Sequence, residues 1–599
     1  MRAAATPVRR ELVEPLRRVL GWMLSLRDAE GAIVCPFHRI EHTGKSAGAA
    51  VLACSLARLD PDANQDELLG VARQQARRLV SRLEREGEST CFTFRPGRHD
   101  PYNCSNSVID GGACSDALAE VVQVFGDRLD PKEREAFARA SVLGAQTYLR
   151  YCVLDKGIPA QKAWALTGVA QAHSLSGHEV LELTVREGAR ILDGLTRPDG
   201  SVPYHPLELG AGHPGASDVS AFYQSRVTGF LAFALERAGL DPASGPWRGQ
   251  LDRGLDFLVG LVGPDGIKPG LVEAKPWYWG ATYEVASHPF DLYALAVGSE
   301  RLGRTDCEAP LRASWRAWAA HLGPDGAPRS HLPGSGRSPS YQCPLFWAGH
   351  ASWAARALPA LDRAWDRPAP QVEEPRVRLF RDAQLARLDG GGVTAWVRGA
   401  RPPGNLYHGS PAGAGLVRVV GAWRDDAQCE GEAGAEELLE RCRLGAHQDG
   451  EWTARVGPPS ALRGLRANGS EARFTTWLAR NAYRGRGLSA SLGPLAAYGL
   501  RGLAAFAGPR VSTAFDRAAS LEPVEGGVRV RARASWRDGK RSALPEVVRT
   551  FTASDAGLRV EEEACGAPGS LRYAVPRRAI QVGQTPQRVS WTLAGAQRP

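Results

Sequence analysis

Pro198-Asp-Gly-Ser-Val-Pro-Tyr204 contains a loop that returns twice further along the chain. Pro264-Asp-Gly-Ile267 and Pro324-Asp-Gly-Ala327 repeat it, so the Asp residues stand at 199, 265 and 325, which are 66 and 60 residues apart. A weaker version, Asp28-Ala-Glu-Gly31, occurs near the N-terminus. In such a turn the Gly takes a positive φ and the Asp side chain bonds its own backbone. The repeat predicts a set of equivalent turns.

The sequence around these loops is helical up to about residue 365. Ala- and Leu-rich runs at helical spacing cover 47–59, 68–86, 114–124, 131–151, 160–173, 180–195, 220–238 and 247–262. Some runs are amphipathic and others are nearly all apolar, which suits two concentric layers of helices. A period of about 60 residues is too long for short solenoid units and favours roughly six helical hairpins. We therefore expect an (α/α)6 toroid, or an incomplete version of one, whose loops line one rim, around a cleft of the kind that holds extended sugar chains.

Composition is that of a folded protein with more than one core. The chain has 599 residues, 43% hydrophobic and 23% charged, and this length exceeds what one compact core supports. Its 11 Cys residues are odd in number and irregularly spaced, which favours a reduced compartment. Residues 1–27 carry Arg throughout, with no signal-like apolar stretch, and no segment is long enough to span a bilayer. We expect a cytoplasmic protein without a membrane partner.

The net charge of +9 comes mainly from Arg residues dispersed along the chain, and no dense Lys/Arg block occurs. A dispersed positive excess suits a polyanion such as a uronate polymer as well as it suits nucleic acid. The partner that we expect is an anionic carbohydrate, with no nucleic acid.

A Pro-rich stretch separates the helical part from a different pattern. Residues 367–375 read Arg-Pro-Ala-Pro-Gln-Val-Glu-Glu-Pro. After it, apolar and polar residues alternate in short runs between Gly-rich turns, which is typical of antiparallel strands. These runs are 377–380, 384–388, 393–397, 416–420, 528–533 and 547–551. The expected organisation is a toroid domain over 1–365, a linker over 366–376 and an antiparallel β-sandwich over 377–599.

One window carries a resemblance to a known family. Asp199-Gly-Ser-Val-Pro-Tyr204 is followed by Ser217-Asp-Val-Ser-Ala-Phe-Tyr223 and an apolar helix. A turn, a loop and a Tyr at the head of such a helix resemble the heparinase II/III-like polysaccharide lyases and their alginate-lyase relatives. The resemblance implies a helical toroid followed by a β-sandwich, and β-elimination on a uronate glycan in which Tyr223 transfers a proton. Arg226 lies three residues further on, hence on the same helical face, where it would bind the uronate carboxylate.

The same resemblance implies an amide or His about one hairpin earlier. The usual Asn-His pair is absent there, and Gln161, beside Lys162, takes its place as the amide donor. Asn103 and Asn106 are the other amide candidates, and each is equally suited to a turn or a helix cap.

A His-containing loop between strands is a further feature that the resemblance implies. Here it reads Gly404-Asn-Leu-Tyr-His-Gly-Ser410, so His408 would act as base or neutraliser from the opposite face, with Tyr407 beside it. The His-x-His-x-x-Asp pattern that usually follows is missing, which argues against a metal in the sandwich. No metal and no cofactor are expected. Cys35, His38 and His42 have ligand types but no fourth partner at a suitable distance.

An aromatic segment follows the second loop, Lys275-Pro-Trp-Tyr-Trp-Gly-Ala-Thr-Tyr-Glu-Val-Ala-Ser-His288. Three aromatic residues in a row cannot all face one core, so we expect them at a glycan-binding rim. The residues proposed here to contact substrate are Trp277, Tyr278, Trp279, Tyr283 and His288.

Two alternatives stay open. Asp110, Asp218 and Glu284 sit near predicted rim positions, and a glycoside hydrolase would need two carboxylates facing each other across the scissile bond. A protein that keeps the fold but only binds glycan or assists biosynthesis would explain the missing Asn-His pair.

Overall fold

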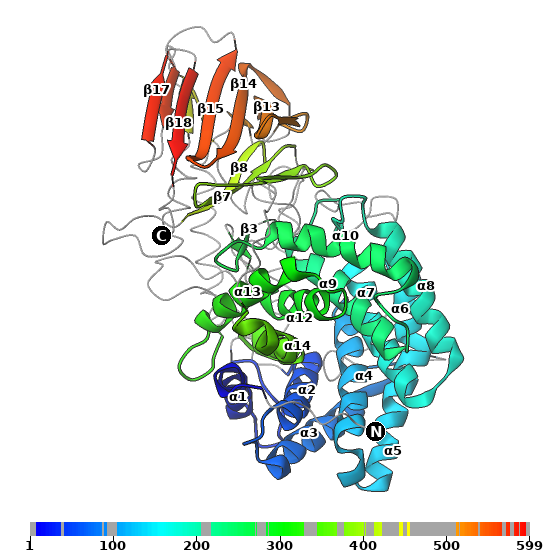
Figure 1. Cartoon of the computed structure of the whole chain (residues 1–599). Coiled ribbons are helices and arrows are strands. Elements are labelled where there is room, and N and C mark those ends of the chain that lie inside the picture. The colour runs from blue at the N-terminus through cyan, green and yellow to red at the C-terminus, as the bar shows by residue number, and fades with distance from the viewer. Residues whose placement is uncertain are drawn as a thin grey trace, which may run out of the picture.

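The computed structural model contains a helical part followed by antiparallel sheets (Figure 1). Its description covers residues 8–36, 41–86, 89–92, 105–204, 217–269, 271, 283–284, 287–328, 344–367, 376–400, 402, 413–421, 443–446, 452–455, 511–513, 516–536, 540–565, 571–574, 580–585 and 588–594. Within these ranges some side chains, including those of residues 105–110 and 283–284, are left out of the description.

Within the described residues, six helices form a closed inner ring. They are α2 (Thr43–Leu59), α4 (Ser105–Phe125), α7 (Pro159–Ser176), α9 (Ala221–Arg237), α12 (His288–Glu300) and α14 (Pro344–Trp365). Each packs on the next, and α14 packs back on α2. The closing seam is tight, because a Cβ on Gly48 would collide with the backbone of Gly349. Two glycines at this contact let the first and last inner helices meet backbone to backbone.

The outer layer consists of helices that each pack against two neighbouring inner helices. Its members are α1 (Arg10–Ser25), α3 (Gln65–Val80), α5 (Pro131–Gly144), α8 (Glu179–Leu195), α10 (Gly245–Leu261) and α13 (Glu308–Ala320). A π-helical turn (Ala145–Leu149) and α6 (Arg150–Asp155) extend α5, and short 3₁₀ turns cover Gly126–Arg128 and Thr305–Cys307. The two layers confirm the predicted helical toroid.

The repeated loops share one geometry. Gly31, Gly200, Gly266 and Gly326 have φ values of 80°, 81°, 80° and 83°. Asp28, Asp199, Asp265 and Asp325 each accept a hydrogen bond from a backbone N–H two or four residues on, at 2.8–3.3 Å. The weaker N-terminal version is therefore structurally equivalent to the other three.

Each of the three Pro-Asp-Gly loops connects an outer helix to the inner helix that follows it in the chain. Each loop also fits closely against a neighbouring outer helix. A Cβ on Gly200 would collide with the Arg253 carbonyl of α10, one on Gly266 with the Ala313 carbonyl of α13, and one on Gly326 with the Arg18 carbonyl of α1. The glycines therefore allow these loops to pack closely against the outer helices.

The strands form two principal packed sheets. One has the order β5-β6-β7-β8, from β5 (Val377–Phe380), β6 (Leu385–Gly390), β7 (Val393–Arg398) and β8 (Gly415–Gly421). The larger sheet has the order β11-β13-β14-β15-β18-β17, with β12 also on β13. Its strands are β11 (Val511–Ser512), β12 (Ser520–Val524), β13 (Gly527–Trp536), β14 (Arg541–Ser554), β15 (Gly557–Cys565), β17 (Ile580–Gln584) and β18 (Arg588–Leu593).

Apolar side chains from both sheets form one core, which confirms a sandwich. Val393, Ala395 and Val397 of β7 pack with Phe551 and Trp591 of the larger sheet. A third sheet pairs β10 (Trp452–Arg455), β9 (Arg443–Ala446) and β16 (Leu571–Ala574). Two-stranded ladders join β1 (Leu83–Glu86) to β2 (Ser89–Phe92) and β3 (Lys268–Pro269) to β4 (Tyr283–Glu284) within the helical part.

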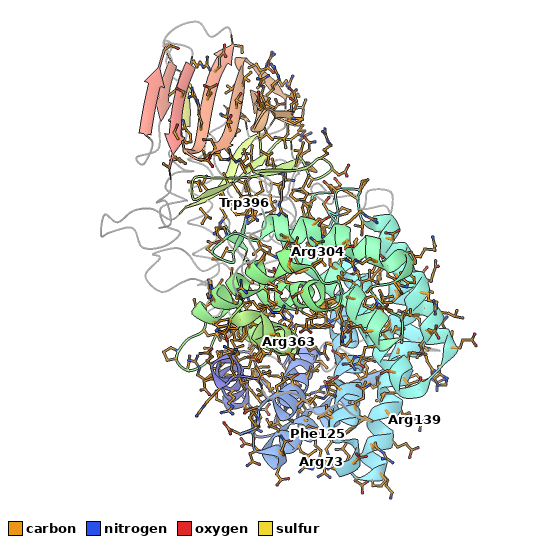
Figure 2. All side chains as sticks on the ribbon, in the orientation of Figure 1. Arg73, Phe125, Arg139, Arg304, Arg363 and Trp396 are labelled. Carbon is orange, nitrogen blue, oxygen red and sulfur yellow. The ribbon has the colours of Figure 1, made fainter. Side chains whose placement is uncertain are left out.

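The opposite face of the four-stranded sheet packs on the toroid. Trp396 is fully buried between β7 and α10, and its Nε1 donates to the Gly260 carbonyl at 2.9 Å (Figure 2). Arg387 donates to the carbonyls of Val259 and Val262 at 3.0 and 3.1 Å. These donors satisfy carbonyl groups that the end of α10 leaves open, and the Arg charge suits the negative end of the helix dipole.

Two loops of the toroid also contact this sheet. Arg418 of β8 forms an ion pair with Asp265 and donates to the Ile267 carbonyl at 2.7 Å. Asp199 accepts from the Ala383 N–H at 2.8 Å. Because both loop aspartates are engaged by the sheet, the toroid and sandwich are joined at the rim that carries the N-terminal ends of the inner helices.

Some boundaries differ from the sequence predictions. The helix expected over 68–86 ends at Val80, and residues 83–86 instead form strand β1, which pairs with β2. Strands β17 and β18 lie in the C-terminal region that the sequence pattern left unassigned. Most of the expected linker, 368–375, lies outside the described residues; α14 ends at Trp365 and β5 begins at Val377.

Candidate functional site

Tyr223 lies in the first turn of α9, at the rim joined to the sandwich. The Ser220 hydroxyl caps this helix by accepting from the Tyr223 N–H at 3.2 Å. The half-buried Tyr223 ring stacks on Tyr204, with centroids 5.6 Å apart and 20° between the planes. Tyr204 follows the first Pro-Asp-Gly loop, and its N–H donates to the Asp218 carbonyl at 2.9 Å. Loop and helix thus present two tyrosines side by side.

Arg226 lies below Tyr223 on the same helical face, as the spacing predicts. Its side chain is fully buried, and its guanidinium lies 3.7 Å from the Phe222 ring centroid and 5.0 Å from those of Tyr223 and Trp164. Phe290 of α12 contributes a further ring at 4.5 Å. Cation–π attraction of this kind holds a guanidinium in a fixed place. The predicted role of Arg226 as a fork for the uronate carboxylate stays a prediction, and in the structure aromatic rings surround its guanidinium.

Lys45 and His350 lie next to the aromatic cluster that surrounds Arg226, which consists of Trp164, Phe222, Tyr223 and Phe290. Lys45 comes from the first turn of α2 and His350 from the second turn of α14, and both are buried. Lys45 Nζ lies 3.3 Å from His350 Nε2 and 4.3 Å from the Phe346 ring centroid. The His350 ring lies 4.6 Å from Phe290 between centroids. No local sequence pattern links these two residues, because they are 305 residues apart.

The surroundings keep His350 neutral. Burial lowers the pKa of His350 well below its ordinary value, and the positive charges of Lys45 and Arg226 lower it further. An ammonium group only donates hydrogen bonds, so His350 Nε2 is the acceptor and Nδ1 carries the ring proton. Within the part of the chain that is described, this buried Nδ1 has no hydrogen-bond partner.

The opposite end of the ring carries a buried ionic network. Arg356 of α14 forms two hydrogen bonds with Asp116 of α4, at 2.8 and 2.9 Å. Glu120 forms ion pairs with Arg58, Arg237 and Arg356. These residues come from later turns of the inner helices. Along the axis of the helical ring, the end near the sandwich therefore carries cationic and aromatic side chains, and the opposite end carries ion pairs.

Three further residues, Gln161, Lys162 and His288, are buried within the helical part. Gln161 is buried in the first turn of α7. Lys162 caps the C-terminal end of α6, because its Nζ donates to the carbonyls of Val153 and Leu154 at 2.8 and 2.9 Å. Burial lowers the pKa of Lys162 to about 8. His288 is buried, and its Nε2 lies 2.9 Å from the Gly266 carbonyl, so it contacts the second Pro-Asp-Gly loop.

Several candidates lie wholly or partly outside the description. His408, Tyr407, Trp277, Tyr278, Trp279, Asn103 and His38 fall outside the described residues. For Asn106 and Asp110 in α4, and for Tyr283 and Glu284 in β4, only the backbone is described. Asn106 therefore stands at the N-terminal end of an inner helix, the same end as Tyr223 and Lys45.

Within the described residues, no group of three or more His, Cys, Asp or Glu side chains is arranged to hold a metal ion. None of the helices described combines the length and the apolar character that crossing a membrane requires. Except for Cys565, the cysteines that the structure describes are buried.

Comparison with known proteins identifies the fold. No family model matches the sequence, and no curated protein does. A xanthan lyase from Paenibacillus has a similar structure, with a TM-score of 0.50 and 10% identity over 95% of this chain and 46% of that one. This chain thus covers less than half the length of that lyase. The toroid followed by antiparallel sheets is the fold that the two proteins share.

Other similar structures have lower scores. A chondroitin AC lyase from Streptomyces coelicolor A3, in complex with chondroitin sulphate, has a TM-score of 0.49 and 12% identity over 98% of this chain and 72% of that one. A glycosyl hydrolase family 88 protein from Bacteroides vulgatus has a TM-score of 0.43 and 14% identity over 59% of this chain and 98% of that one.

Proposed function

We propose that this protein is a carbohydrate-active enzyme that cleaves a uronic-acid-containing glycan by β-elimination. The observation that carries the proposal is the position of Tyr223 at the N-terminal end of an inner helix, with Arg226 beneath it and Lys45 in the same aromatic cluster. A proton-transfer group beside fixed cations is the arrangement that this reaction needs. The shared fold with a xanthan lyase is consistent with it.

The reaction breaks two bonds and forms one double bond. The C5–H bond next to the uronate carboxylate breaks, the electron pair forms the C4–C5 double bond, and the bond from C4 to the glycosidic oxygen breaks. Tyr223 in its ionised form takes the C5 proton, and its phenol then returns a proton to the departing oxygen. Nearby cations favour the ionised phenol and neutralise the carboxylate, which makes the C5 proton more acidic.

The remaining sequence candidates extend this proposal. Gln161 and Asn106 would supply an amide donor from the N-terminal ends of α7 and α4. His408 and Tyr407 would act from the sandwich, which the contacts of Arg387, Arg418 and Trp396 hold against the same rim. Trp277, Tyr278, Trp279 and Tyr283 would stack on sugar rings.

A glycoside hydrolase with a carboxylate pair is the alternative. One candidate for that pair, Asp218, is buried and engaged by Arg398 of β7. A carboxylate in a buried ion pair is poorly suited to act as a general acid, which must be protonated. Hydrolysis would then depend on Asp110 and Glu284, the other two candidates for the pair.

Incubation with a panel of anionic glycans tests the proposal. Chondroitin, alginate, heparin and xanthan preparations should be included, each with a carboxyl-reduced counterpart. A new ultraviolet absorbance marks the unsaturated uronide that elimination leaves, and reduced glycans should give none. Release of new reducing ends without this absorbance would contradict the proposal and support hydrolysis.

A further inference from the structure

Two cationic side chains and one neutral histidine gather at the end of the ring that carries Tyr223. Lys45, Arg226 and His350 come from the N-terminal turns of α2, α9 and α14, and each is at most 5% exposed. Helix N-termini add positive potential at the same end. This end is therefore rich in hydrogen-bond donors and in positive charge.

The ring seam fixes Lys45 against His350. Because Gly48 and Gly349 bring α2 and α14 into backbone contact, a Cβ on Gly349 would lie only 2.8 Å from Lys45 Cδ. The Lys45 stem thus runs along Gly349, and its ammonium reaches His350 Nε2 and the Phe346 ring. A side chain confined in this way is pre-organised, so it loses little freedom when it binds a ligand.

The contact with Lys45 leaves Nδ1 of His350 as a hydrogen-bond donor. Its Nε2 accepts from Lys45, so its Nδ1 donates, and among the described residues no acceptor lies within reach of this buried nitrogen. Leaving a buried donor without a hydrogen-bond partner costs free energy. This cost points to an acceptor that a bound ligand supplies.

We propose that Lys45 and His350 form the subsite for the carboxylate of the acidic sugar, with Lys45 as its charge partner and His350 Nδ1 as a second donor. The inference rests on the proposed function and deepens it. It moves carboxylate recognition from Arg226, which aromatic rings enclose, to the seam between the first and last inner helices. Arg226 then contributes positive potential and holds the Tyr223 ring.

The test compares binding of chondroitin and alginate hexasaccharides with binding of their carboxyl-reduced forms by calorimetry. Lys45→Met should weaken binding of the carboxylate form about tenfold or more, as expected for loss of a charge-assisted hydrogen bond. Binding of the reduced form should change less than about twofold, a difference near measurement error. His350→Phe should show the same selectivity with a smaller loss. Lys132→Met, at an exposed site on α5, removes the same charge and should change neither affinity.

Circular dichroism and melting temperature establish that each variant is folded, and Lys45→Arg, which keeps the cation, should retain part of the affinity if Lys45→Met does not fold. Equal weakening for both glycan forms, or none, would overturn the subsite while leaving cleavage by the wild type intact. If the wild type neither yields unsaturated product nor prefers the carboxylate form, the proposed function itself is wrong.

Discussion

Arg398 of β7 forms a buried ion pair with Asp218, which stands two residues before the N-cap of α9. Their side chains are 2% and 0% exposed. The Asp218 carboxylate also accepts from the Val219 N–H at 2.8 Å, and its backbone carbonyl holds Tyr204. The sandwich therefore helps to position both tyrosines of the candidate site.

Breaking this pair should destabilise the protein. Asp218→Asn leaves the Arg398 charge buried without its partner, which costs about 3–5 kcal/mol for pairs of this kind. We expect lower activity together with a lower free energy of unfolding, measured by chemical denaturation. Adding Arg398→Met should restore much of both. Lost activity at wild-type stability, without recovery in the double variant, would instead mark Asp218 as a catalytic carboxylate.

Tyr223→Phe should remove most activity and leave the fold intact. The ring that stacks on Tyr204 and contacts Arg226 is kept, while the proton-transfer hydroxyl is lost at a cost of roughly 10² to 10⁴ in rate. Turnover and melting temperature are the two measurements. Tyr204→Phe is the matched control and should keep far more activity; equal losses in both variants would refute the special role of Tyr223.

The toroid could be predicted because its signal is local. Each Asp-Gly turn carries its own requirement for a positive φ, and apolar runs mark the inner helices. The seam between Gly48 and Gly349 could not be predicted, since it depends on two small residues that only ring closure brings together.

The candidate site was partly predictable for the same reason. Tyr223 and Arg226 share one helical face, so their spacing predicts their proximity. Lys45 and His350 come from opposite ends of the helical part, and no local pattern links them. The roles of Lys162 and Asp218 were missed because capping of α6 and pairing with the sheet are tertiary contacts.

The repeated turns provide a test of close packing. Gly266→Ala places a Cβ at φ +80° against the Ala313 carbonyl, whereas Gly303→Ala has φ +66° with open space around it. Both variants incur the left-handed penalty of about 1–2 kcal/mol. Only the first adds a backbone collision, so its unfolding free energy should fall by clearly more. Equal losses by denaturant titration would show that the loop does not need its close approach to α13.

The ionic network at the far end should make stability depend on pH. Burial raises the pKa of Glu120, but the charges of Arg58, Arg237 and Arg356 outweigh it and bring this pKa to about 2, below its ordinary 4.5. The lowered value corresponds to roughly 3 kcal/mol of stability. This contribution is present above about pH 4.5 and is lost as the pH falls toward 2.

Glu120→Gln should therefore lower the unfolding free energy most at neutral pH, with the difference from wild type shrinking in acid. Glu187→Gln, at an ion pair on the exposed surface of α8, is the control and should have little effect, as is usual for surface pairs. A Glu120 difference that stays constant between pH 7 and pH 3 would rule out this account of the network.

The most direct test of β-elimination is cleavage of an active glycan in water enriched in ¹⁸O, with mass spectrometry of both new chain ends. Elimination breaks the bond between C4 and the glycosidic oxygen, so that oxygen stays on the anomeric carbon. The account predicts no ¹⁸O at the new reducing end beyond slow exchange, and a C4–C5 double bond on the other product. Stoichiometric ¹⁸O at the anomeric carbon, without the double bond, would contradict it.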